Sequence, residues 1–160
     1  MSEDRDAWAL LGGIEGLGTA TALDLVETCG GAAKVIDAAE RGDPDGTLAA
    51  RLSARAIRRE GAPAPPELHA RLVAAARERT TRLEALERAG IGVLTLDEPD
   101  YPARLRATET PPPVLYLRGE TPAIAAPRAV AVVGTRRPTE EGRRTAARIA
   151  GALARAGAVI

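Results

Sequence analysis

The 160-residue sequence is poor in the side chains that usually carry metal or redox chemistry. It has one cysteine, Cys29, and one histidine, His69. A single cysteine cannot form an internal disulfide, and the two residues together are too few for a zinc cluster. We therefore expect no metal centre and no bound cofactor, and the scarcity of cysteine favours a reducing cytoplasm.

Aromatic residues and long apolar runs are also scarce. The sequence has no phenylalanine and only three aromatic residues, Trp8, Tyr101 and Tyr116, so its core must consist of alanine, leucine, valine and isoleucine. No apolar run reaches eighteen residues, so the sequence predicts neither a membrane span nor a secretory signal. At 45% apolar and 28% charged residues the composition is globular.

The net charge of zero is the sum of two unlike parts. Residues 1–50 hold ten acidic and three basic residues, net −7, whereas residues 51–160 hold twelve acidic and nineteen basic residues, net +7. Within the basic part, residues 128–160 carry seven arginines against Glu140 and Glu141, net +5. An anionic partner is therefore expected first in this segment, the alternative being a solvated face.

The first 90 residues have the periodicity of short helices. Glycine and proline punctuation divides residues 3–89 into about five helices, of which the fifth is predicted from Pro66 to Ala89. The punctuation falls at 12–18, 30–31, 42–46 and 61–66. Residues 1–90 are therefore predicted to form an all-α domain.

The period changes after Gly90. Strands are predicted at 91–96, 114–117 and 129–133, and the last of these is a continuous apolar run typical of a strand buried on both faces. A helix is predicted from Pro138 to Ala156, and a new apolar segment begins at Ala158. The face that this helix should bury consists of Ala146, Ile149, Ala150 and Leu153. Because a parallel sheet needs several β-α-β units, we expect residues 91–160 to be the incomplete front portion of a longer α/β domain.

The first candidate site is the segment IEGLGTATAL, which has the pattern of a helix-hairpin-helix. Gly16 and Gly18 permit the tight turn, and the amides that begin the second helix could contact a nucleic-acid phosphate. However, the segment lies in the acidic part, with Glu15 in the hairpin and no basic residue between Arg5 and Lys34. A structural hairpin is favoured, and Gly16 and Gly18 are kept as a minor DNA contact.

The second candidate site is the turn that follows the apolar run at 129–133. Gly134 ends the run, Thr135, Arg136 and Arg137 follow, and Pro138 is expected at the first helical position. A helix N-terminus beyond a strand end suits an anion, to which a threonine hydroxyl and an arginine add hydrogen bonds. Neither the dinucleotide fingerprint nor the P-loop sequence is present. From the residues alone, phosphate binding and a plain turn remain open alternatives.

The third candidate is the segment 101–119, where Tyr101 and Tyr116 alternate with arginines and three consecutive prolines. Such aromatics can stack on bases, and core packing is the favoured alternative for both. No residue set in the sequence indicates a nucleophile with a base or a pair of catalytic carboxylates, so no catalytic residue is predicted.

The order of these features resembles the DNA-processing protein A (DprA/Smf) family of bacterial natural transformation. The segment TLDEPDYPARLRATETPPPVLYLRG is similar to that family's Y-P-x-x-L…P-P-x-V-L-Y-x-x-G signature, and VAVVGTRRPTEEG is similar to its V-G-[ST]-R-x-x-[ST]-x-x-G opening. The resemblance covers residues from about 8 to 160. It implies a helix-hairpin-helix (SAM-like) domain in residues 1–90, followed in residues 91–160 by the truncated start of a Rossmann-like parallel α/β domain.

The resemblance also implies a function. Members of the family bind single-stranded DNA, shield it from nucleases and help to load the RecA recombinase, without catalysing a reaction, and the full-length proteins self-associate. DNA phosphates are expected near Gly134, Thr135 and Arg136, with Arg137 beside them. The family's frequent aromatic residue before Gly142 is Glu141 here, whose charge would repel a phosphate. Two alternatives stay open: a phosphoribohydrolase-like enzyme that processes nucleotides, and a protein-docking role for the acidic N-terminal domain.

Overall fold

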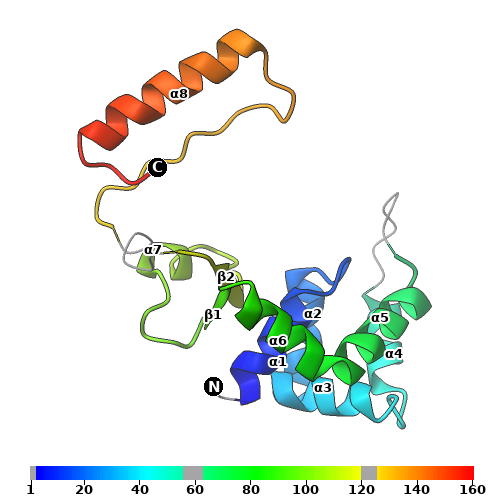
Figure 1. The fold of residues 1–160 in the computed structure, drawn as a ribbon. Coiled ribbons are helices and arrows are strands. Elements are labelled where there is room, and N and C mark those ends of the chain that lie inside the picture. The colour runs from blue at the N-terminus through cyan, green and yellow to red at the C-terminus, as the bar shows by residue number, and fades with distance from the viewer. Residues whose placement is uncertain (1–2, 56–62, 120–125) are drawn as a thin grey trace. The chain divides into compact units, whose positions relative to one another are not determined.

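The computed structural model describes residues 3–55, 63–119 and 126–160 (Figure 1). The chain divides into two compact units, the N-terminal unit (Met1–Gly119) and the C-terminal unit (Glu120–Ile160). The described residues are mostly helical, with one small antiparallel sheet, so the predicted combination of helices and strands is confirmed. None of the described helices is long and apolar enough to cross a bilayer.

The described residues of the N-terminal unit before Gly90 form short helices, most of them separated by glycine-containing turns. Gly30, for example, ends its helix with φ +76°, a left-handed conformation that glycine adopts without steric cost. In order along the chain the helices are α1 (Glu3–Gly12), α2 (Thr19–Cys29), α3 (Ala32–Glu40), α4 (Thr47–Ala54), α5 (Pro65–Arg77) and α6 (Arg79–Arg88).

The prediction of a single helix from Pro66 to Ala89 is wrong, because the structure has two helices there. Glu78, with φ −94° and ψ 14°, separates α5 from α6. α5 packs against α3 and α4, whereas α6 contacts α1. Because the periodicity is helical on both sides of Glu78, it cannot show this change of direction, which tertiary packing imposes.

The core of the N-terminal unit is aliphatic, as the lack of aromatic residues requires. Its central side chains come from α1 to α5, and partly buried Trp8 packs against them. Each such side chain contributes roughly 1.5–3 kcal/mol through burial. The largest of them, all exposed by no more than 2%, are Leu11, Leu25, Val35, Ile36, Leu48, Leu52 and Leu72.

A two-stranded antiparallel sheet completes the N-terminal unit. β1 (Gly92–Thr95) pairs with β2 (Val114–Leu117), which confirms the first two predicted strands. The short helix α7 (Ala103–Arg106) lies in the connection. Both strands pack against α1, so the compact unit reaches Gly119, whereas the division made from the sequence falls after Gly90.

Gly12 at the end of α1 allows β2 to approach closely. A Cβ added at Gly12 would lie 2.6 Å from Val114 Cγ1 and 2.8 Å from the Tyr116 hydroxyl oxygen. The same hydroxyl donates a hydrogen bond of 2.5 Å to the carbonyl of Ala9. The N-terminal helix and the strand signature are therefore parts of one packed unit.

The C-terminal unit contains helix α8 (Glu140–Arg155) between two extended segments. An isolated parallel bridge joins Ala129 to Val159, with Val130 N donating to Val159 O at 2.9 Å and Val159 N donating to Arg128 O at 2.8 Å. The predicted strand at 129–133 is thus represented by a single bridge among the described residues. Its parallel sense around α8 is that of a β-α-β crossover.

Two further expectations for the C-terminal unit need correction. Pro138 precedes the N-cap instead of occupying the first helical position, because Thr139 takes the N-cap and its side chain accepts a hydrogen bond from Gly142 N. The predicted apolar face of α8 is not buried, and Ile149 is 48% exposed. Ala146, Ala150 and Leu153 are half-buried, so the described elements of the C-terminal unit cover that face only in part.

Candidate nucleic-acid interface

The second candidate site is an exposed loop in the C-terminal unit. It comprises residues 134–139 and joins the extended segment 129–133 to α8 (Figure 1). Every residue of the loop is exposed, and a Cβ added at Gly134 would meet no atom within 4 Å. No described residue covers the loop, so a macromolecular ligand can reach it.

A local hydrogen bond shapes the loop. Arg137 N donates to Thr135 Oγ1 at 3.2 Å. A hydroxyl can accept one hydrogen bond and donate another, so the Thr135 proton is still available for an acceptor outside the chain. A phosphate oxygen is such an acceptor.

The N-terminus of α8 follows directly. Thr139 Oγ1 accepts from Gly142 N at 3.1 Å, and Thr139 O accepts from Arg143 N at 3.0 Å. No described residue accepts a hydrogen bond from the N–H of Glu140 or Glu141, as is usual for the first turn of a helix. These amides and the helix dipole leave partial positive charge beside the loop.

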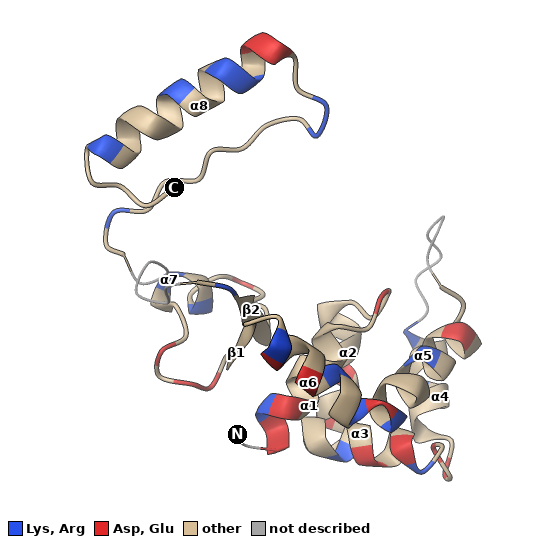
Figure 2. Cartoon of the chain, in the orientation of Figure 1, with Lys and Arg blue, Asp and Glu red and all other residues tan. Residues whose placement is uncertain are grey.

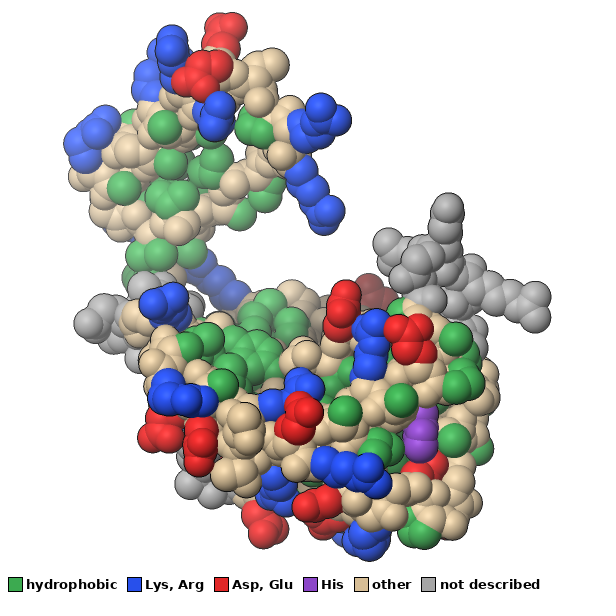
Figure 3. All heavy atoms as spheres, turned by 45° about the vertical axis from the view of Figure 1, so that its right-hand side comes forward, with side chains coloured by type: hydrophobic (Ala, Val, Ile, Leu, Met, Phe, Trp, Pro, Cys, Tyr) green, Lys and Arg blue, Asp and Glu red, His purple; other side chains and the backbone are tan. Residues whose placement is uncertain are grey.

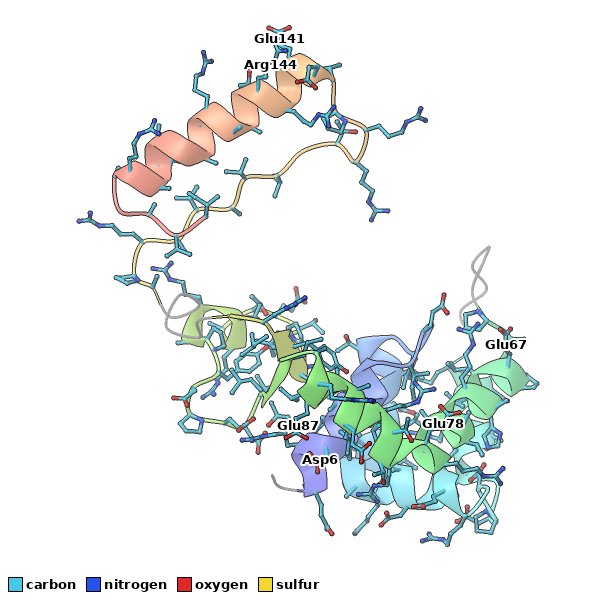
Figure 4. All side chains as sticks on the ribbon, viewed as in Figure 1. Asp6, Glu67, Glu78, Glu87, Glu141 and Arg144 are labelled. Atoms are coloured by element: carbon cyan, nitrogen blue, oxygen red, sulfur yellow. The ribbon has the colours of Figure 1, made fainter. Side chains whose placement is uncertain are left out.

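The ionic side chains divide into paired and unpaired groups. Glu140 pairs with Arg143 at 2.9 Å and with Arg144 at 3.3 Å, so its charge is largely balanced within α8. Arg136 and Arg137 form no ion pair with any residue in the described ranges. Figure 2 shows where acidic and basic residues fall along α8, and Figure 4 labels the side chains of Glu141 and Arg144 near its first turn.

Glu141 is the one acidic group near the loop without an ion pair to a described residue, and it opposes the two arginines. Its single negative charge reduces the positive potential at the helix end but does not cancel it, because the two arginines carry two positive charges. The loop therefore presents two cations, a hydroxyl and free helix amides, a set of groups suited to a phosphodiester.

The first candidate site lies in the N-terminal unit and has a different character. Gly16 has φ +89° and lies directly against the Pro63 ring. Arg71 Nη1 donates to the carbonyl of Glu15 at 2.7 Å, which fixes the hairpin to α5. Gly18 is the N-cap of α2, with open space around it, while the neighbouring Glu15 side chain is 91% exposed. Glu15 also forms an ion pair with Arg71 at 3.4 Å, so the one acidic group of the hairpin is paired, and the hairpin itself contains no basic residue for a phosphate.

The two tyrosines of the third candidate site differ in exposure, and Tyr116 is 39% exposed. Tyr101 is 2% exposed, and its hydroxyl donates to the carbonyl of Pro112 at 2.7 Å. Arg106 lies over its ring, 5.7 Å from the centroid. Burial raises the pKa of Tyr116 to about 12. The core role is confirmed for Tyr101, whose ring is not accessible to a base.

Sequence reasoning missed a polar pair between the turn that joins α3 to α4 and helix α5. His69 Nε2 lies 3.2 Å from Asp43 Oδ2, and Asp43 has a positive φ of 55°. The same carboxylate accepts from the amides of Leu48 and Ala49 at 3.0 and 2.9 Å, so it caps α4. The sequence Asp-Pro-Asp-Gly at 43–46 is typical of a turn. The pairing of Asp43 with His69 has no local signal, because it depends on how the turn packs against α5.

No group of three or more histidine, cysteine, aspartate or glutamate side chains that could hold a metal ion occurs in residues 3–55, 63–119 and 126–160. Burial, with smaller effects from Asp45 and Asp43, raises the pKa of the Cys29 thiol. A thiol held in its neutral form is a poor nucleophile.

Comparison with known proteins relates the second part of the chain to a known family. Residues 92–160 match the family described as DNA recombination-mediator protein A. This stretch contains both the strand signature of the N-terminal unit and the arginine-containing loop. The resemblance to the DNA-processing protein A (DprA/Smf) family is confirmed, and residues 92–160 carry it.

Two curated proteins illustrate the relationship. The chain is 38% identical over 76 residues to Protein Smf of Synechocystis sp., and 31% identical over 78 residues to DNA processing protein DprA of Bacillus subtilis. The matched residues make up 42% and 49% of this chain, and 18% and 26% of the two relatives. The chain therefore spans no more than about a quarter of the length of these relatives. No solved structure matches the chain significantly.

Proposed function

We propose that this chain is part of a single-stranded DNA-binding protein of the DNA-processing type. In this proposal the protein protects incoming single-stranded DNA and helps to load RecA during natural transformation, and it catalyses no reaction. The observation that carries the proposal is the family match, because it includes the loop 134–139 whose geometry independently suits a phosphate.

The phosphate contact is assigned to Gly134, Thr135, Arg136 and Arg137. Gly134 leaves space for the backbone of a strand of DNA, and Thr135 retains a donor proton. The two arginines have no acidic partner in the described ranges, so they do not have to break an ion pair before they bind. Charge-assisted hydrogen bonds to phosphate are among the stronger polar contacts.

The C-terminal unit is proposed to begin a Rossmann-like sheet. The parallel bridge between Ala129 and Val159, with α8 between them, supports this assignment. In such sheets ligands bind beyond the carboxyl ends of the strands, which is where the loop 134–139 follows the extended segment. The helix-hairpin-helix assignment of the N-terminal unit is likewise part of the proposal, with Gly16 and Gly18 given at most a minor DNA contact.

Interaction with RecA, self-association of the whole protein and a cytoplasmic location rest on the family resemblance. They are properties proposed for the longer protein, because the chain spans only a fraction of its curated relatives. The two compact units differ in charge in a way that fits this proposal. DNA contact is assigned to the C-terminal unit, and the acidic first 50 residues are assigned no principal contact with DNA.

The test is the binding of a fluorescent oligo-dT to the 160-residue chain, measured by anisotropy over a salt series that starts at about 50 mM. Arg136→Ala combined with Arg137→Ala should weaken binding and reduce the slope of log K against log salt by about 0.7 for each lost contact. Arg148→Ala combined with Arg155→Ala removes the same charge from α8 outside the loop and is the matched control.

If the loop contacts phosphate, the slope of log K against log salt should fall more in the loop double variant than in the control double variant. Equal slopes for the two double variants would remove the loop as the phosphate site. If the unaltered chain and the unaltered longer protein both failed to bind oligo-dT at about 50 mM salt, the proposed function itself would be wrong.

A further inference from the structure

A hollow lies beside β1 in the N-terminal unit, between α1 and α6. We call it the β1 groove; its volume is about 430 Å³. Its apolar lining comes from α6 and β1 and includes Leu83, Leu86, Ile91 and Val93, all of them half-buried. An apolar hollow of this kind is a place where a partner side chain can be removed from water.

The backbone of β1 presents an open edge to this groove. Leu96 N donates to Pro113 O at 3.0 Å, and the register pairs Leu94 with Leu115, so even-numbered residues of β1 direct their backbone groups toward β2. The backbone groups of Val93 therefore point the other way. No described residue forms a hydrogen bond with the N–H or C=O of Val93, which also lines the groove.

The rest of the same edge is already occupied. Thr95 N donates to Glu98 Oε2 at 2.7 Å, and Glu98 N donates to Thr95 O at 3.0 Å. Ile91 N donates to the carbonyl of Leu86 at 2.9 Å. The open part of the edge is thus short and centred on Val93, which limits an added strand to a few residues.

The rim of the groove is acidic. Asp6 from α1 and Glu84 and Glu87 from α6 line it, and none of the three forms an ion pair with a residue in the described ranges. Arg5 also lines the groove, but its charge is paired with Glu98, so the lining keeps a net negative charge. Asp6 and Glu87 are labelled in Figure 4, where they lie near each other at the adjoining ends of α1 and α6. Three unbalanced carboxylates around an apolar floor attract cations and repel phosphate.

We propose that the β1 groove binds an extended segment of a partner protein in which apolar and basic residues alternate. The segment adds to β1 as a short strand and forms hydrogen bonds with the N–H and C=O of Val93. Its apolar side chains enter the groove, and its lysine or arginine side chains reach Asp6, Glu84 and Glu87. Because the rim repels phosphate, this surface is distinct in function from the arginine-containing loop of the C-terminal unit.

The probe is a fluorescent eight-residue peptide of alternating valine and arginine, added to the 160-residue chain and followed by anisotropy. We expect saturable binding. A peptide of alternating valine and glutamate, and the valine–arginine peptide with N-methylated backbone, should each bind at least about tenfold more weakly, a factor that corresponds to roughly 1.4 kcal/mol.

Two pairs of variants separate the contributions of charge and backbone. Glu84→Lys with Glu87→Lys should weaken binding at least about tenfold, whereas Glu27→Lys with Glu109→Lys changes the net charge equally, away from the groove, and should leave it within about twofold. Val93→Pro removes the edge N–H without breaking the ladder, and Val93→Ala shortens the side chain and keeps the N–H. The proline variant should bind several-fold more weakly than the alanine variant, with both retaining the circular dichroism of the unaltered chain.

The proposal is overturned if the proline and alanine variants of Val93 bind the valine–arginine peptide equally well. It is also overturned if the two charge-reversed variants lose the same affinity for that peptide. Sedimentation of the chain alone tests another occupant. A dimer that forms with rising concentration and is abolished by Val93→Pro would show that a second copy of this chain covers the edge. Loss of oligo-dT binding in the Glu84→Lys, Glu87→Lys variant would also contradict the proposal that the β1 groove binds a protein segment, since the proposed DNA site lies in the other unit.

Discussion

The two units of this chain carry similar apolar patterns in sequence and treat them differently in structure. In the N-terminal unit the large aliphatic side chains of α1 to α5 lie in one core, with Leu11 and Leu72 fully buried. In the C-terminal unit no described residue is buried, and Val133 is 89% exposed. Figure 3 shows hydrophobic side chains at the surface of this unit. Periodicity therefore shows which face of a helix is apolar, and it does not show whether another element covers that face.

The largest effect should come from a core substitution that has no counterpart in the C-terminal unit. Leu72→Ala leaves a cavity among α3, α4 and α5 and should lower the free energy of unfolding by about 2–5 kcal/mol. Ile149→Ala, on the exposed face of α8, should change it by less than about 0.5 kcal/mol. Urea denaturation followed by circular dichroism measures both.

This contrast can also fail in an informative way. If Ile149→Ala destabilised the chain as much as Leu72→Ala, the apolar face of α8 would be covered in solution, and the difference between the units would disappear. Sedimentation of the unaltered chain at the same concentrations would then show whether a second copy provides the cover.

A second comparison uses glycines at a close approach and in open space. Gly12→Ala places a methyl group against Val114 and the Tyr116 hydroxyl, and should cost about 1–3 kcal/mol as β2 is displaced from α1. Gly134→Ala meets nothing within 4 Å and should leave the free energy of unfolding within about 0.5 kcal/mol. Equal effects on the urea midpoint would mean that β2 does not pack on α1 through Gly12.

Much of the N-terminal unit could be predicted from local sequence signals. Glycines and prolines mark most helix ends, and the strands at 92–95 and 114–117 coincide with runs of branched and aromatic residues. The break at Glu78 and the docking of the strands on α1 could not be predicted. Both depend on contacts between residues far apart in sequence, such as Tyr116 with Ala9.

The candidate site divides in the same way. The loop 134–139 was found from its sequence, because a glycine after an apolar run and before a helix is a local pattern. The start of α8 was misplaced by two residues. Pro138 is compatible with the first helical position, but Thr139 is the N-cap, because its side chain accepts a hydrogen bond from Gly142 N. The open edge at Val93 has no sequence signal, because it follows from strand register.

A smaller effect in the N-terminal unit should depend on pH. Partial burial tends to raise the pKa of the Glu98 carboxyl, and the hydrogen bonds from Thr95 together with the Arg5 guanidinium outweigh this, so the pKa is lowered from its ordinary value of 4.5. Because the folded pKa lies below the unfolded one, the stabilisation is present above pH 4.5 and is lost as the pH falls through the folded pKa.

Glu98→Gln should therefore cost about 1 kcal/mol at neutral pH and reduce the loss of stability on acidification below pH 4.5. Asp100→Asn, a nearby exposed position without an ion pair to a described residue, is the control and should leave the profile unchanged. Urea midpoints measured from pH 7 to pH 3 test this. Parallel profiles for Glu98→Gln and the unaltered chain would contradict the stabilisation by the Glu98 carboxylate.

The smallest effect should stay within the C-terminal unit. Thr139→Ala removes the side-chain acceptor for Gly142 N and should destabilise the first turn of α8 by about 0.5–1 kcal/mol. Hydrogen exchange at Gly142 and Arg143 should accelerate, while the urea midpoint of the N-terminal unit should not move, because α8 belongs to a separate compact unit. Thr139→Ser restores an acceptor and should restore protection. A shift of the N-terminal unit's midpoint in the alanine variant alone would show that the two units unfold together.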